Sequence, residues 1–205
     1  MAIDPVALLG PDGAIARKLP GYEVRQEQIQ MAEVVARAIE SGTHLMVEAG
    51  TGVGKSFGYL APAILAVTEL GKKVVVSTRT INLQEQLIGK DLPFLRSVLP
   101  QEFDAVLVKG RSNYVSLRRL ESAAARAGST AGSEEAKQLE ELRGWSAGTE
   151  DGSLSDLSFR PIETVWESVQ SDSGNCLKQS CPRYRQCFFF KASRRSHKAD
   201  ILRGR

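Results

Sequence analysis

The 205-residue sequence is 42% hydrophobic and 25% charged, which is enough apolar material for one sizeable core and a small second domain. Its longest apolar stretch, residues 59–67, is much shorter than the roughly 18 residues of a membrane span, and its first residues lack the basic start of a signal peptide. Three clustered cysteines do not form the even set of a secreted disulfide scaffold. We therefore expect a cytoplasmic protein without a membrane partner.

Positive charge is concentrated near the carboxyl end. Residues 176–205 contain nine Lys and Arg against one acid, Asp200, whereas the formal net charge of the whole sequence is only +3. The aromatic residues Tyr184 and Phe188–Phe190 lie among these cations. Aromatic rings beside cations suit the bases and phosphates of single-stranded nucleic acid. The alternative is a solvated basic tail.

The first half of the sequence alternates helix and strand patterns. Apolar residues at helical spacing predict a helix from Arg25 to Ser41, and residues 44–48 (HLMVE) predict a short strand. After a glycine-rich turn, residues 56–70 predict a second helix that Gly71 ends. This order of elements is typical of an α/β fold.

Further strands and a helix follow the same pattern. The three valines at residues 74–76 predict a strand buried on both faces, and residues 105–108 predict another parallel strand. Thr80 or Asn82 is expected to cap a short helix that runs to about Leu87. We therefore expect an α/β fold with a parallel sheet and helices on both of its faces. Residues 111–191 are expected to form a small, mainly helical inserted domain.

The glycine-rich turn has the pattern of a phosphate-binding loop, because it separates a predicted strand from a predicted helix. Its glycines let backbone N–H groups point inward, and the helix N-terminus adds a dipole that favours phosphate. Lys55 would reach the β- and γ-phosphates, and the Ser56 hydroxyl would bind Mg²⁺. The full pattern starts with glycine where this sequence has Ala49. The predicted ATP and Mg²⁺ ligands are Gly50, Thr51, Gly52, Val53, Gly54, Lys55 and Ser56, with catalytic roles for Lys55 and Ser56.

Two segments together resemble helicase motifs I and Ia of the DinG/XPD family of superfamily 2. They are residues 48–56 (EAGTGVGKS) and residues 77–87 (STRTINLQEQL). Upstream, residues 22–28 (YEVRQEQ) resemble the Q-like motif of this family, which implies that Gln28 reads the adenine edge and that Arg25 supports it. Downstream, residues 109–114 (KGRSNY) resemble the start of the family's iron–sulfur insertion.

The resemblance implies a domain organisation. Residues 1–110 would be the N-terminal part of a RecA-like ATP-binding domain with a P-loop parallel sheet. Residues 111–191 would be the iron–sulfur-type insertion, and residues 192–205 would return toward the RecA-like domain. The implied activity is an ATP-dependent DNA helicase that moves on single-stranded DNA, typically 5′ to 3′, in repair or replication. The implied partner is single-stranded or forked DNA.

Residues expected to contact DNA lie in two places. Hydroxyl and amide side chains follow the strand at 74–76, where open α/β sheets present their ligand loops, and such groups suit the phosphate backbone. Others lie at the start of the insertion. The full set is Thr78, Thr80, Gln84, Arg111, Asn113 and Tyr114. For Thr80, capping of the following helix is an equal alternative.

The three cysteines have the spacing C-x4-C-x5-C at Cys176, Cys181 and Cys187. Clustered thiolates suit iron–sulfur clusters or zinc. In the resembled family a fourth cysteine follows the Asn-Tyr pair, where this sequence has Ser116. An iron–sulfur cluster, a zinc site completed by His197, and metal-free thiols packed with the neighbouring phenylalanines remain as alternatives.

A helicase also needs an acid pair after a strand, which holds Mg²⁺ and orients the attacking water. The sequence contains no such motif, and the resembled family places it beyond a stretch like residues 199–201. We therefore expect the N-terminal portion of a larger helicase, truncated before motif II and without the second RecA-like domain. The isolated chain is expected to be inactive. A non-catalytic nucleotide- or DNA-binding module is the alternative.

Overall fold

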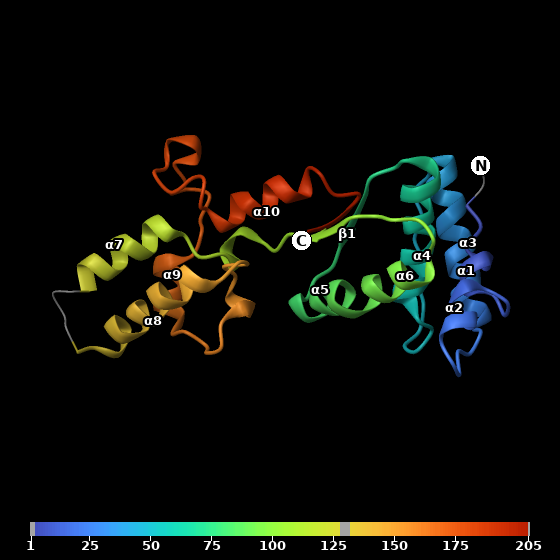
Figure 1. Cartoon of the computed structure of the whole chain (residues 1–205), viewed down its shortest axis with the longest axis horizontal. Coiled ribbons are helices and arrows are strands. Elements are labelled where there is room, and N and C mark those ends of the chain that lie inside the picture. Colours follow the sequence, from blue (N-terminus) through green and yellow to red (C-terminus); the bar gives the residue numbers. More distant parts are fainter. Residues whose placement is uncertain (1–2, 128–131, 205) are drawn as a thin grey trace. The chain divides into compact units, whose positions relative to one another are not determined.

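The computed structural model describes residues 3–127 and 132–204 and is mostly helical (Figure 1). The chain divides into two compact units. Unit 1 comprises Met1–Leu107 with Ala199–Arg203, and unit 2 comprises Val108–Lys198 with Gly204–Arg205. Each unit has a hydrophobic core of its own. In the described part of the chain, no helix is both long enough and apolar enough to cross a bilayer.

Helices make up most of unit 1. They are α1 (Val6–Leu9), α2 (Ala14–Lys18), α3 (Gln26–Ser41), α4 (Lys55–Leu70), α5 (Ile81–Gln86), the π-helical turn η1 (Leu87–Asp91) and α6 (Leu92–Val98). The two long helices confirm the predictions from apolar periodicity. Both end at a glycine in the left-handed conformation, Gly42 with φ 66° and Gly71 with φ 61°, which a side chain would strain.

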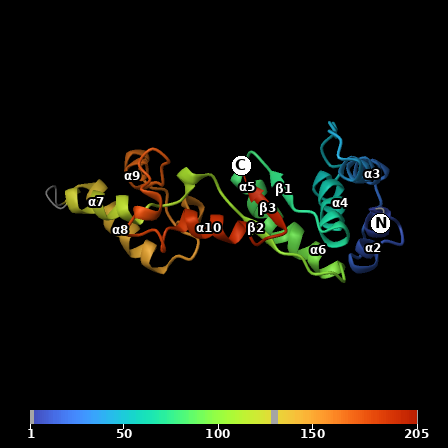
Figure 2. The same cartoon turned by 90° about the horizontal axis from the view of Figure 1, so that it is seen from above.

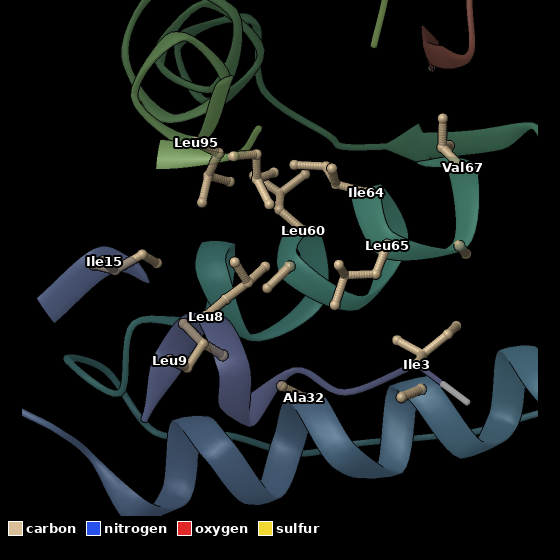
Figure 3. Packing of buried hydrophobic residues seen from close by; sticks show 14 of the residues in the cluster. Ile3, Leu8, Leu9, Ile15, Ala32, Leu60, Ile64, Leu65, Val67 and Leu95 are labelled. Carbon is tan, nitrogen blue, oxygen red and sulfur yellow. The ribbon is translucent and has the colours of Figure 1, made fainter. Parts of the chain in front are cut away.

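The core of unit 1 forms around α4 (Figure 3). Leu60, Ile64 and Leu65 project from α4 toward side chains of α1, α2 and α6, and Ala32 lets α3 approach closely. Because the middle of α4 is buried, packing fixes the axis of this helix. The start of α4, where the glycine-rich loop ends, is therefore held in place by the core.

Three short strands form a small sheet that lies in unit 1 except for Gly204, the last residue of the third strand (Figure 2). They are β1 (Val74–Ser77), β2 (Ala105–Leu107) and β3 (Ile201–Gly204), in the order β1-β3-β2. Strands β2 and β3 are parallel, with Ala105 opposite Ile201. The Asp200 carbonyl accepts from the Val74 N–H at 3.0 Å. The strands predicted at residues 74–76 and 105–108 are thus present.

The strand predicted at residues 44–48 is not formed. These residues have no regular secondary structure and are exposed, Met46 to 97%. A strand needs a hydrogen-bonded neighbour, and the described residues give this segment none. Val75 of β1 is also 63% exposed, so β1 is not buried on both faces as predicted. The expected parallel sheet with two covered faces is therefore present only in part.

Unit 2 is mainly helical. It contains α7 (Leu117–Ala127), α8 (Glu134–Gly148), α9 (Glu163–Val169), α10 (Phe188–Ser196) and the 3₁₀ turns η2 (Arg111–Asn113), η4 (Leu154–Asp156) and η5 (Lys178–Ser180). The Ser133 hydroxyl caps α8 by accepting from the Ala136 N–H at 3.2 Å. Tyr114, Val115 and Trp166 are among the core residues that join these helices.

Candidate functional site

The glycine-rich loop leads directly into α4. Gly54 is the N-cap of this helix, with φ 81°, and Gly52 has φ 86°. Such positive φ values suit glycine and turn the chain sharply. The loop therefore presents the first turn and the positive dipole end of a 16-residue helix to an anion.

Lys55 and Ser56 occupy the first turn of α4. The Lys55 ammonium donates to the carbonyl oxygens of Ala49 at 3.1 Å and Gly50 at 2.8 Å. Lys55 is exposed and Ser56 is half-buried. The lysine cation is thus held at the mouth of the loop, where phosphate oxygens can replace the two carbonyl partners.

Two side chains of the Q-like segment, residues 22–28, form hydrogen bonds with the same loop. The Arg25 guanidinium donates to the Gly52 carbonyl, and the Gln28 amide nitrogen donates to the Gly54 carbonyl at 2.8 Å. The Gln28 amide oxygen lies 3.0 Å from the Tyr22 hydroxyl, which donates to it. Gln28 is only 4% exposed, and both ends of its amide have partners within the protein. Its predicted role in reading adenine remains a prediction.

A pocket of about 380 Å³ lies beside the loop. Its lining residues are Leu19, Gly21, Tyr22, Glu23, Arg25, Gln28, Gly54 and Phe57. This volume lies within the range of small-molecule sites. Burial raises the pKa of Tyr22, with a smaller opposing effect of Arg25, so the phenol keeps its proton at neutral pH. The pocket therefore offers apolar surface, a phenol and a cation next to the end of the loop.

We expect Gly54→Ala to weaken ATP binding by at least about tenfold, because positive φ is costly for alanine. A Cβ atom at this position would also overlap the Gln28 amide nitrogen, so the loop and the Q-like segment would have to separate. Calorimetric titration with MgATP measures the change. Gly89→Ala is the matched control, since a Cβ there meets no atom within 4 Å. Equal affinity in the two variants would contradict the expectation.

The residues predicted to contact DNA in unit 1 surround the start of α5. The Thr80 hydroxyl accepts from the Leu83 N–H at 3.4 Å, which confirms the predicted cap. The Gln84 amide nitrogen donates to the Thr78 carbonyl at 3.3 Å, and Gln84 is 4% exposed. These contacts order the turn between β1 and α5. Contact of these residues with DNA remains a prediction.

The residues predicted to contact DNA in unit 2 have different surroundings. The Arg111 guanidinium lies 4.1 Å from the centre of the Phe189 ring, and the Asn113 side chain donates to the Gly110 carbonyl at 3.2 Å. Tyr114 is 1% exposed, and its hydroxyl accepts from the Lys109 N–H at 2.9 Å. The Tyr114 ring thus packs in the core of unit 2, and its hydroxyl has a backbone partner. Contact of these residues with DNA remains a prediction.

The three cysteines and Ser116 line one small pocket of about 30 Å³. The cysteines are free and half-buried. Ser116 and Cys176, which are 60 positions apart in the sequence, thus line the same pocket. No group of three or more His, Cys, Asp or Glu within residues 3–127 and 132–204 is arranged as a metal site. His197 follows the end of α10 and does not line this pocket, so the zinc alternative gains no support.

Hydrogen bonds hold the segment that carries Cys176. The Arg118 guanidinium donates to the Asn175 carbonyl at 2.6 Å, and Asp172 accepts from the N–H groups of Gly174 and Asn175. The Gly174 N–H and then the Asn175 side chain lower the pKa of Asp172, so this carboxylate stays ionised. The chain before Cys176 is thus shaped by its own contacts.

Sequence reasoning missed one buried polar network in unit 2. The Lys109 ammonium contacts the Asp151 carboxylate at 3.0 Å and the hydroxyls of Ser153 at 2.7 Å and Ser155 at 2.6 Å. Lys109 is 6% exposed and Ser153 is fully buried. The partners are more than forty positions from Lys109, so local sequence patterns carry no signal for this network.

The comparisons with known proteins show which proteins this chain is similar to. No family model matches the sequence. The chain is nevertheless homologous to ATP-dependent DNA helicases. The particular relatives are the helicases named YoaA and DinG. The resemblance seen in the sequence motifs is thereby confirmed.

The similarity extends over nearly all of this chain. YoaA of Escherichia coli (strain K12) is 42% identical over 193 residues, which cover 94% of this chain and 30% of YoaA. YoaA of Haemophilus influenzae is 33% identical over 192 residues, which cover 93% of this chain and 29% of that relative. DinG of Escherichia coli (strain K12) is 32% identical over 211 residues, which cover 92% of this chain and 28% of DinG. The chain thus spans about 30% of the length of the curated relatives it matches.

Proposed function

We propose that this chain is the ATP-binding portion of a DinG/YoaA-like helicase, which couples ATP hydrolysis to movement on single-stranded DNA in repair or replication. The observation that carries the proposal is the attachment of the Q-like segment to the glycine-rich loop. Arg25 and Gln28 each bond a loop carbonyl beside the pocket of about 380 Å³. Phosphates at the loop and a base in the adjacent pocket fit this arrangement. Homology supports a RecA-like fold for unit 1.

In this proposal each residue of the loop has a separate task. The N–H groups at the start of α4 bind phosphate oxygens, and Lys55 exchanges its two carbonyl partners for the β- and γ-phosphates. Ser56 offers the hydroxyl that suits Mg²⁺, since hard cations prefer oxygen ligands. Mg²⁺, when bound, neutralises charge on the phosphates. The residues present at the loop therefore fit a magnesium–nucleotide complex.

The DNA side of the proposal rests on polar groups near β1 and on the basic end of the chain. Thr78 and Thr80 lie at the carboxyl end of β1, where parallel sheets place ligands. In unit 2, the exposed cations Lys191, Arg194 and Arg195 of α10 supply a surface for phosphates. DNA binding should therefore weaken steeply with salt.

A non-catalytic nucleotide- or DNA-binding module is the competing function, and turnover separates the two. We propose that the isolated chain binds ATP and single-stranded DNA but hydrolyses ATP negligibly, because its sequence has no acid pair for Mg²⁺ and water. The test combines an ATPase assay with DNA-binding anisotropy at roughly 50 and 200 mM salt. Longer chains of this protein that include an acid pair should then hydrolyse ATP when DNA is added. A longer chain that binds both ligands without turnover would favour the non-catalytic module.

We also propose that the three cysteines bind an iron–sulfur cluster, with Ser116 at the fourth ligand position. Three thiols and one hydroxyl line the same pocket, and soft thiolates are the usual ligands of such clusters. The cluster would link the cysteine-bearing segment that follows Asp172 to Ser116, the residue just before α7. The pocket has to expand from its present size of about 30 Å³ to admit a cluster.

We expect protein purified without oxygen to contain iron and sulfide, and Cys181→Ala to lose both, because two remaining thiols hold a cluster poorly. Ser116→Cys should retain iron longer in air than the natural sequence, since it restores a fourth thiolate. Metal analysis and the visible absorption spectrum measure these changes. Ser180→Ala, which alters an exposed neighbour of Cys181, is the control. Stoichiometric zinc without iron would overturn this proposal.

A further inference from the structure

Gln28 is the middle of a hydrogen-bond chain that ends at the glycine-rich loop. Its amide nitrogen donates to the Gly54 carbonyl at 2.8 Å, and its amide oxygen accepts from the Tyr22 hydroxyl at 3.0 Å. The Tyr22 hydroxyl also lies 3.1 Å from the Leu9 carbonyl at the end of α1, so its single proton is shared between this carbonyl and the Gln28 amide oxygen. The contacts thus connect the amino-terminal helices with the residue that caps α4.

The orientation of the Gln28 amide decides whether this connection holds. An amide has one donor end and one acceptor end. If it were reversed, its oxygen would face the Gly54 carbonyl oxygen and the two acceptors would repel. The Tyr22 hydroxyl favours the observed orientation because it supplies a donor to the amide oxygen. Gln28 is 4% exposed, so water does not readily replace that donor.

The direction of the Gly54 carbonyl matters for anion binding. Gly54 has φ 81°, and its conformation sets where the first N–H groups of α4 point. We infer that Tyr22 is a positioning residue of the nucleotide site, which acts through Gln28 on the shape of the loop. This inference rests on the proposed nucleotide binding and adds a residue to which that proposal gives no role. It also assigns Gln28 to holding the loop.

The test compares two ligands in Tyr22→Phe, which keeps the ring and removes the hydroxyl. We expect the Kd of MgATP to rise about five- to tenfold, the effect of one partly buried hydrogen bond. We expect the Kd of magnesium tripolyphosphate to rise by the same factor, because this ligand has no base and reports the loop alone. Thr68→Val is the matched control. It removes a half-buried hydroxyl of α4 that bonds the Ile64 carbonyl of its own helix, and should leave both affinities unchanged.

A double-mutant cycle tests whether Tyr22 acts through Gln28. Gln28→Met keeps the side-chain length and removes both hydrogen bonds, so it should weaken tripolyphosphate binding by itself. In that background Tyr22→Phe should have no further effect. If Tyr22→Phe fails to fold, the tripolyphosphate affinity of Gln28→Met alone still shows whether this hydrogen-bond chain affects the loop.

The possible outcomes separate this inference from the proposed function. Weaker ATP binding with unchanged tripolyphosphate binding would mean that Tyr22 acts on the base, and would overturn the inference. Additive effects in the cycle would overturn it as well. If Lys55→Ala abolishes binding while Tyr22→Phe does not change it, only the inference fails. If the natural sequence binds neither ligand, the proposed function fails with it.

Discussion

Lys55→Ala is expected to raise the Kd of MgATP on the order of 100-fold, because the lysine would make charge-assisted hydrogen bonds to two phosphates. The side chain already lies against the loop, bonded to the Ala49 and Gly50 carbonyls at 3.1 and 2.8 Å. Little reorganisation is therefore needed to reach phosphate. Calorimetry with MgATP and with MgADP measures the loss.

Lys90→Ala is the matched control for this change. Lys90 is an exposed lysine of the same unit, on the turn η1, and its removal lowers the net charge equally. The affinity of the Lys90→Ala variant for ATP should stay within about twofold of that of the natural sequence, because salt screens an exposed charge. Equal losses in the two variants would show that net charge, and not the loop, governs binding.

Asp151→Ala is expected to destabilise unit 2 by about 3 kcal/mol, because it removes the counter-ion of the buried Lys109 ammonium. The value is at the lower end for a broken buried pair, since the Asp151 side chain is 44% exposed and water partly replaces it. The hydroxyls of Ser153 and Ser155 stay near the ammonium but carry no negative charge.

Tryptophan fluorescence during urea unfolding measures this effect selectively, because both tryptophans of the sequence, Trp145 and Trp166, lie in unit 2. Glu140→Ala is the control. It breaks an ion pair with Arg143 whose side chains are 63% and 55% exposed, and should cost no more than about 0.5 kcal/mol. A shift of the urea midpoint as small for Asp151→Ala as for Glu140→Ala would contradict a structural role for the buried network.

Local patterns predicted the parts of the fold that local forces determine. The helices α3 and α4 follow from apolar periodicity and from the glycines at their ends, and the Thr80 cap follows from its position before a helix. The strand predicted at residues 44–48 failed for a reason that its own residues do not contain. Its stability depends on a neighbouring strand, and exposed Leu45, Met46 and Val47 show that this segment has none among the described residues.

The candidate site was predictable in its residue types but less so in its contacts. The loop residues followed from their pattern, whereas the burial of the Gln28 amide between Tyr22 and Gly54 depends on how α3 packs against the loop. Tyr114 illustrates the same limit, because an aromatic ring with a hydroxyl suits either a DNA contact or a core position. The packing of its ring in the core, at 1% exposure, depends on the tertiary structure.

Photolabelling with 8-azido-ATP, followed by mapping of the labelled peptide, tests the central claim most directly. The account predicts saturable labelling that excess MgATP prevents, with the label in residues 19–28, the segment that contributes most of the pocket lining beside the loop. Labelling should be lost in Lys55→Ala, because the phosphates are then no longer held. Saturable labelling outside the pocket-lining residues, or labelling that Lys55→Ala does not change, would contradict the assignment of this pocket and loop as the ATP site.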